Sequence, residues 1–383
     1  MTMVQYGIDR VNEFPSLLRD GRVALLTSVT GRSSDNRSTI DLLHEQYHLT
    51  ALLGPEHGVR GDQAAGVLTG NYIDPHTGLT VFSLYSAAGK RLRQEMLDTF
   101  DILVCDLQDV GLRFYTFLTT VCYLVEDCAK HRKRLVVLDR PAPLGGGVVE
   151  GGLLQEAYRS FVGCRRVPVR YGLTLGEFAK MVNEKEGLGC ELEVVPCGNW
   201  HGEPFPQWGQ IWQMPSLGLP TFEGTALYAG TCLFEGTALS EGRGTAAPFR
   251  IIGAPGVDSE RFTRAFNALG LPGAVATPVY FVPTCSKHQG ENCGGLMLHL
   301  TDFAALRPVE LGLRLLDLFQ RLYPEQSAFL PPPKEGGRPF ISLISGCDDF
   351  VPGWDCDAVV ARYEQESAAF AREKAAYHLY ERV

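Results

Sequence analysis

The sequence predicts an α/β protein in which a doubly wound parallel sheet is followed by a smaller α+β domain, and three observations support this prediction. Five short apolar runs alternate with amphipathic stretches before Gly146. The runs are continuously hydrophobic, as expected for parallel strands that are buried on both faces. The pattern changes beyond the glycine-rich stretch LGGGVVEGG, and a chain of 383 residues is long enough for two domains.

The first part of the chain alternates predicted strands with predicted helices. The strands are RVALLTSVTG, LTALLG, LTVFSLYS, DILVCDLQD and RLVVLDRP, and the helices are STIDLLHEQ, KRLRQEMLDTF and YTFLTTVCYLVEDCAKH. Because strands that are joined through helices lie parallel, we expect a Rossmann-like domain over residues 1–150. No GxGxxG motif follows the first strand, so a dinucleotide site has little support.

The second part, residues 151–383, predicts an α+β domain. Thr174 and Glu177 have the spacing of a capping box, so a helix is expected to begin there and Glu177 is assigned to the cap. The predicted strands are LEVVPC, PVYFVPT and GGLMLHLTD, and the predicted amphipathic helices are RPVELGLRLLDLFQRLYP and DAVVARYEQESAAFAREKAAYHL.

Composition and charge argue against several classes of function. The formal net charge of -9 argues against a nucleic-acid partner. Eleven cysteines form no CxxC pair, so we expect reduced, mostly buried thiols, and we expect no metal or other cofactor. The chain shows no apolar signal core and no run that could span a bilayer, which predicts a cytoplasmic protein with no membrane partner.

Polar residues follow the ends of three predicted strands. In parallel sheets, ligands bind beyond the carboxyl ends of the strands, so these residues should converge on one edge. Neighbouring carboxylates at such an edge suit acid/base chemistry. The second run is followed by Glu56, His57 and Arg60, the fourth by Asp106, Asp109, Arg113 and Tyr115, and the fifth by Asp139 and Arg140.

Two segments of the second part carry further candidates. Trp200, Trp208 and Trp212 fall within residues 198–220; each is individually expected in packing, and at least one is expected to be a platform for a sugar ring. EGTALSEGRGT places Glu241 and Arg243 among small residues, where the arginine could hold a carboxylate or simply pair with a glutamate to organise the loop.

Structural roles compete with functional ones at the same residues. Glu56 could cap a turn, and His57 could bind only backbone. Asp106 and Asp109 could each be a turn or N-cap residue, and we expect that one of them is. Arg113 could pair with either aspartate.

Nine stretches, in order and over nearly the whole chain, resemble the NamZ-type exo-β-N-acetylmuramidases, a family of glycoside hydrolases. The resemblance implies removal of N-acetylmuramic acid from the non-reducing end of peptidoglycan fragments, with a small muropeptide or amino-sugar disaccharide as substrate. It also implies an active site in a cleft between a Rossmann-like domain and a second domain that contributes substrate-binding loops. The stretches are GPEHGVRGDQAAG, SLYS, DLQDVGLRFYTFLTT, LDRPAPLGG, VEGGLL, VPVRYGLTLGE, EGTALSEGRGTAAPF, GAPG and VPTCSKHQGENCGG.

The chain departs from the family pattern where the family commonly has asparagine, at Ala142, Gly218 and Ala238. Because amides donate and accept hydrogen bonds, their loss bears on which sugar is bound. The alternatives are a sugar-binding or regulatory protein and a hydrolase of a related amino-sugar glycoside. Retaining, inverting and substrate-assisted mechanisms all remain open.

We expect Glu56 to be the general acid, which requires burial or a neighbouring carboxylate to keep its proton at neutral pH. His57 is expected to orient Glu56 or bind substrate, and Asp109 and Glu241 are the other catalytic candidates. Arg243, or otherwise Arg113, is expected to receive the lactyl carboxylate of the sugar. The full set of expected substrate-binding residues is Arg60, Asp106, Arg113, Tyr115, Asp139, Arg140, Trp212 and Arg243.

Overall fold

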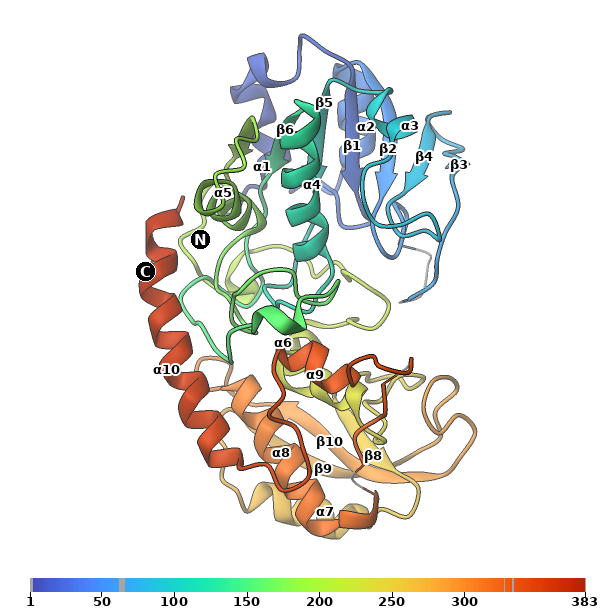
Figure 1. Ribbon diagram of the computed structural model, residues 1–383, viewed down its shortest axis with the longest axis vertical. Helices are drawn as coiled ribbons and strands as arrows, with labels where there is room; N and C mark the ends of the chain where they lie inside the picture. The colour runs from blue at the N-terminus through green and yellow to red at the C-terminus, as the bar shows by residue number, and fades with distance from the viewer. Residues whose placement is uncertain (1–2, 62–65, 327, 333, 383) are drawn as a thin grey trace. The chain divides into compact units, whose positions relative to one another are not determined.

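The computed structural model describes residues 3–61, 66–326, 328–332 and 334–382. Over these ranges the chain is a mixed α/β protein with one large, mostly parallel sheet (Figure 1). It divides into two compact units. The first unit comprises Met1–Val148, Gly172–Leu217 and Ala371–Val383, and the second comprises Val149–Tyr171 and Gly218–Phe370.

The first unit is built around a seven-stranded sheet. All neighbouring strands pair in parallel except β3, which pairs antiparallel with β4. The runs VALLT and ILVCD are buried at every position, which agrees with strands that are covered on both faces. The spatial order is β3 (Tyr72–Ile73), β4 (Thr80–Ser83), β2 (Leu49–Gly54), β1 (Val23–Thr27), β5 (Ile102–Asp106), β6 (Arg134–Leu138) and β7 (Leu192–Val195).

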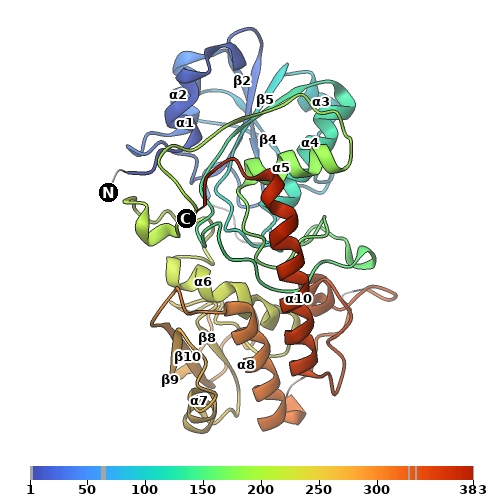
Figure 2. The same ribbon diagram turned by 90° about the vertical axis from the view of Figure 1, so that its left-hand side faces the viewer.

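Helices lie on both faces of this sheet. Helices α3, α4 and α5 cover one face, and α1 and α2 lie on the other (Figures 1 and 2). The longest of them, α4, ends at His131 and is followed by Arg132, which adopts the left-handed conformation that commonly terminates helices. The helices are α1 (Gly7–Arg10), α2 (Thr39–Gln46), α3 (Gln94–Leu97), α4 (Phe117–His131) and α5 (Leu175–Lys185).

The first unit extends beyond the single boundary that the sequence suggested near residue 150. The run LEVVPC, expected in the second domain, forms β7 and pairs in parallel with β6. Helix α5 packs on β6 and β7, so this region completes the first sheet. The predicted start of α5 is confirmed, because Thr174 and Glu177 form both hydrogen bonds of the capping box.

The second unit contains a three-stranded antiparallel sheet in the order β8 (Ile251–Ala254), β10 (Cys293–Leu300) and β9 (Ala274–Phe281). Helix α7 packs on β9 and β10, and α6 packs on α8. The last helix, α10 (Cys356–Lys374), begins in this unit, and its final residues group with the first unit. The other helices are α6 (Phe222–Thr231), α7 (Ser259–Asn267), α8 (Pro308–Leu322) and α9 (Phe340–Ser345).

Close packing of α6 on α8 depends on two glycines. A Cβ atom added at Gly230 would collide with the carbonyl oxygen of Pro308, and one added at Gly312 would collide with the backbone of Gly230. Alanine normally stabilises a helix relative to glycine, but here the clash should outweigh that gain.

We therefore expect Gly230→Ala to destabilise the protein by about 1–3 kcal/mol. The shift of the denaturant midpoint measures the effect. Gly70→Ala is the control, because a Cβ atom there would meet nothing within 4 Å. Equal midpoints for the two variants would contradict the packing argument.

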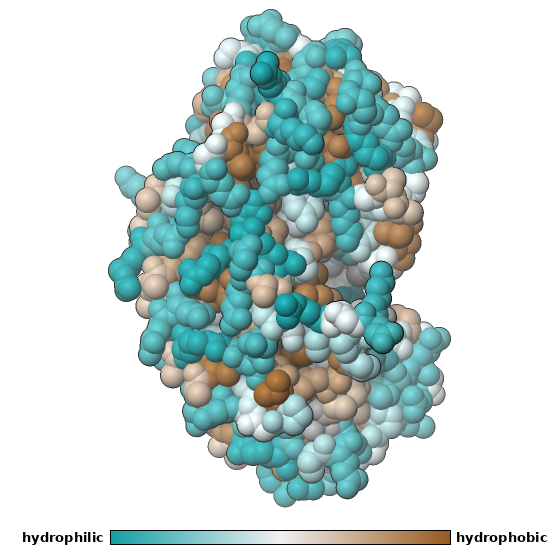
Figure 3. Space-filling view, in the orientation of Figure 1, coloured by the Kyte–Doolittle hydropathy of each residue, from teal (hydrophilic) through white to brown (hydrophobic). Residues whose placement is uncertain are grey.

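Polar and charged residues cover most of the face seen in Figure 3, and hydrophobic residues appear there only in small groups. Ten of the eleven cysteines are buried and Cys285 is exposed, which confirms the expectation of mostly buried thiols. Within the described ranges, no helix is long and apolar enough to cross a membrane. In the same part of the chain, no three His, Cys, Asp or Glu side chains lie close enough to hold a metal ion.

Candidate active site

The parallel pairing of β2, β1, β5 and β6 places their carboxyl ends at one edge of the first sheet (Figure 1). β1 pairs with β2 on one side and with β5 on the other, so the strand order reverses between β1 and β5. Ligands of open α/β sheets bind at such a switch point. The predicted convergence of the strand ends is therefore confirmed.

Glu56 lies in the loop after β2 and is 8% exposed. Its Oε1 accepts a hydrogen bond from the Gly66 N–H, and its Oε2 accepts one from the Thr116 hydroxyl, both at 2.8 Å. Thr116 directly precedes α4, so the carboxylate is held between its own loop and a helix start.

His57 adopts a left-handed backbone conformation with φ of 77° and is buried. A non-glycine residue rarely takes this conformation, and such strain persists only where the surroundings enforce it. Gly58 follows with φ of 73°, so the chain turns sharply directly after Glu56. The role of His57 in orienting Glu56 or binding substrate stays a prediction.

Tyr115 lies near both Glu56 and Asp109. Burial, and then the charges of Asp109 and Glu56, hold the pKa of its phenol well above the usual range. Its hydroxyl donates to the Pro215 carbonyl at 2.9 Å. Asp109 accepts a hydrogen bond from the Gly111 N–H at 2.6 Å, which confirms that one of the two aspartates is a turn residue.

Asp106 and Arg140 form a fully buried ion pair at the ends of β5 and β6. Both carboxylate oxygens of Asp106 accept from the Arg140 guanidinium, and the Thr39 hydroxyl donates to the same carboxylate. Arg140 also donates to the Arg32 carbonyl at 2.7 Å and lies over the Tyr6 ring, 4.6 Å from its centroid. The pair thus joins three segments beneath the edge of the sheet.

Asp139 is turned toward α5 and the C-terminal segment. It accepts hydrogen bonds from the Thr174 hydroxyl, the Gly176 N–H and the Tyr380 hydroxyl. Burial raises the pKa of Asp139 to about 6, although the hydrogen bonds from Thr174 and Tyr380 act in the opposite direction. These contacts make Asp139 an anchor of the fold, and a role in substrate binding stays a prediction.

The remaining arginines of this edge differ in exposure. Arg113 is completely buried. Arg60 is one-third exposed and forms an ion pair with the buried Asp74 at 2.8 Å. Of these two arginines, Arg60 presents part of its side chain to solvent and Arg113 does not.

Two of the three tryptophans in residues 198–220 belong to the core. Trp200 and Trp208 are each 2% exposed, pack in one cluster with Val4, and donate their indole N–H groups to the Glu203 carbonyl. Trp212 is half-buried, borders a cavity and lies edge-on to Phe205. Trp212 is the tryptophan of this segment that could form a sugar platform.

Glu241 and Arg243 lie in the second unit within a group of charged residues. Arg243 donates to Glu235 through Nε and Nη2 at 2.8 and 2.6 Å, and its Nε lies 3.4 Å from Glu241. Lys287 Nζ lies 2.7 Å from the other oxygen of Glu241. The charge of Arg243 is therefore already balanced, as the loop-organising alternative predicted.

Three residues near Glu56 were not predicted from the sequence: Thr116, Tyr85 and Lys90. Burial, then the Glu56 charge and a hydrogen bond to Glu56, raise the pKa of Tyr85. Burial lowers the pKa of Lys90, and the Glu56 charge opposes this. The presence of Tyr85 in the SLYS motif could have marked it as a site residue. No comparable motif in the sequence marks Lys90.

Known proteins match this chain over nearly its whole length. Peptidoglycan beta-N-acetylmuramidase NamZ of Bacillus subtilis is 38% identical, over 98% of this chain and 91% of that protein. Two crystal structures of DUF1343 family proteins from Bacteroides fragilis also match, each over its whole length. One has a TM-score of 0.90 and 33% identity and covers 99% of this chain. The other has a TM-score of 0.80 and 29% identity and covers 100% of this chain.

Family models for the N-terminal and C-terminal parts of exo-beta-N-acetylmuramidase NamZ match residues 23–223 and 226–380, in that order. The first match includes the whole edge of the sheet that carries Glu56, and the second includes Glu241 and Arg243. Matches of this extent on both sides of residue 225 show that the chain belongs to the NamZ exo-β-N-acetylmuramidase family.

Proposed function

We propose that this protein is an exo-acting glycoside hydrolase that releases N-acetylmuramic acid from the non-reducing end of peptidoglycan fragments. One observation carries the proposal: in this member of the NamZ family a buried glutamate, Glu56, follows β2 at the carboxyl edge of the mostly parallel sheet, and Tyr115 lies near it. A small muropeptide or disaccharide is the proposed substrate.

In this reaction Glu56 is the general acid that protonates the departing glycosidic oxygen, and His57 orients it or binds the sugar. Asp109, which like Glu56 lies near Tyr115, is the second carboxylate proposed to act in catalysis. Glu241 stays a further catalytic candidate, and Arg243 stays a further candidate for binding substrate.

Incubation with a chromogenic N-acetylmuramide and with an N-acetylmuramyl disaccharide tests the proposal. We expect release of the chromophore and of free N-acetylmuramic acid, unaffected by a chelator. Tight binding without release would instead select a sugar-binding protein, the alternative that Ala142, Gly218 and Ala238 suggest. Ala142 gives weaker support for that alternative, because its side chain is buried in the cluster of Trp200 and Trp208.

A further inference from the structure

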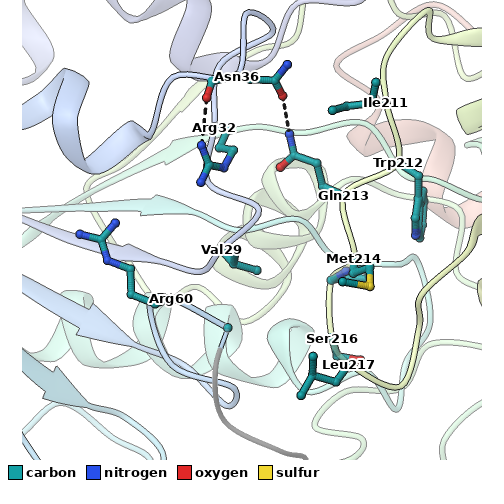
Figure 4. Close-up of a pocket in the computed structure, with 12 residues that line it drawn as sticks. Val29, Arg32, Asn36, Arg60, Ile211, Trp212, Gln213, Met214, Ser216 and Leu217 are labelled. Carbon is teal, nitrogen blue, oxygen red and sulfur yellow. Dashed lines mark hydrogen bonds between the residues drawn. The ribbon is translucent and has the colours of Figure 1, made fainter.

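A cavity of about 630 Å³ lies at the carboxyl edge of the first sheet, within the first unit. Its size falls in the range of pockets for small organic ligands. Arg32 and Arg60 approach it from the loops after β1 and β2, and residues 211–217 form the opposite wall (Figure 4).

The wall formed by residues 211–217 is largely apolar. Ile211, Met214 and Leu217 are 63%, 45% and 57% exposed, and Trp212 lies among them. The described residues that line the cavity include no acidic side chain. The cavity therefore suits a ligand with an apolar stem and a negative charge at its end.

The two arginines differ in how their charge is balanced. Arg60 donates to both oxygens of Asp74, so its charge is largely neutralised. Arg32 makes no ion pair with any described residue; one of its N–H groups donates to the Asn36 carbonyl at 3.0 Å. Asn36 is itself held by Gln213, whose amide donates to the Asn36 side chain at 3.0 Å (Figure 4). Arg32 is thus oriented by polar contacts and keeps donors for an anion.

Hydrogen bonds connect the cavity wall with Glu56. Tyr115 donates to Pro215, which lines the cavity, and the adjacent Thr116 donates to Glu56. Arg60 lies on the same loop as Glu56. A sugar whose glycosidic bond is at Glu56 could therefore extend a substituent into the cavity.

We propose that this cavity receives the lactyl arm of the muramic acid, and that Arg32 binds a carboxylate carried on that arm. The inference rests on the glycosidase function proposed above and identifies a specificity residue for it. The carboxylate is either the free lactyl acid or an acid on a peptide that is linked to it, because both present the same group to a guanidinium.

The test uses chromogenic N-acetylmuramides in two matched pairs: the free lactyl acid with its methyl ester, and a lactyl dipeptide with a terminal carboxylate or a terminal amide. Arg32→Met should lower kcat/KM about 10- to 100-fold for the acidic member of one pair, mainly through KM, and leave the neutral members unchanged. The pair that responds identifies the source of the carboxylate. Equal effects on acidic and neutral members of both pairs would overturn the proposal.

Two further variants and one binding measurement control this test. Arg32→Lys should recover part of the acid preference, and Arg37→Met should retain all of it, because Arg37 is exposed and pairs with Glu45. Calorimetric titration of the same ligands into Glu56→Gln, with and without Arg32→Met, reports binding without turnover. A lost preference for acids in this titration supports the Arg32 assignment even if no glycoside is hydrolysed, whereas an unchanged preference refutes it.

Discussion

Replacing Glu56 by glutamine should lower kcat on an unactivated N-acetylmuramyl disaccharide by about 10²–10⁴-fold, while substrate affinity stays near that of the unaltered protein. Glutamine keeps the shape of the side chain. Its amide oxygen can still accept from the Gly66 N–H, and its NH₂ group can donate to the Thr116 hydroxyl oxygen. The proton donor is the only group that is lost, so the effect should fall on turnover.

Leaving-group dependence and a control sharpen this prediction. An activated aryl leaving group needs little protonation, so Glu56→Gln should lose less activity on the aryl glycoside than on the disaccharide. Glu45→Gln is the control, because Glu45 is an exposed glutamate that pairs with Arg37. Near-native turnover of Glu56→Gln on the disaccharide would remove Glu56 from this role and make Glu241 the next residue to test.

The parallel sheet could be predicted from the sequence because each of its inner strands is a continuous apolar run. Membership of β7 could not be predicted, because LEVVPC reads as a strand in any sheet and only its pairing with β6 decides which sheet it joins. The same holds for α5, whose capping box fixes where the helix begins but not what it covers.

The site was predictable where it follows from topology. Parallel strands share a carboxyl edge, so the approximate positions of Glu56 and Asp109 follow from strand order alone. The contacts of Glu56 with Gly66 and Thr116 depend on the shape of a long loop, which no periodicity encodes. Composition likewise could not predict that Trp212 lies beside a cavity whereas Trp208 lies in the core.

Breaking the buried ion pair at this edge should have the largest effect on stability. Arg140 is the ion-pair partner of Asp106, and the two side chains are 3% and 0% exposed. Arg140→Met leaves the Asp106 carboxylate buried with only the Thr39 hydroxyl as a side-chain donor among the contacts described above. Removing one partner of a buried pair typically costs about 3–5 kcal/mol, because the remaining charge is uncompensated.

The double variant Asp106→Leu/Arg140→Met tests this cause. It removes both charges, so it should be less destabilised than Arg140→Met alone. Arg22→Met is the control, because it removes a bidentate arginine–aspartate contact that is exposed to solvent. The side chains of the Arg22–Asp101 pair are about half exposed, so this pair should contribute little to stability. Tryptophan fluorescence during urea unfolding reports mainly on the first unit, since Trp200, Trp208 and Trp212 lie there and only Trp354 lies in the second. If the double variant unfolds at a lower urea concentration than Arg140→Met, the uncompensated charge is not the cause of the lost stability.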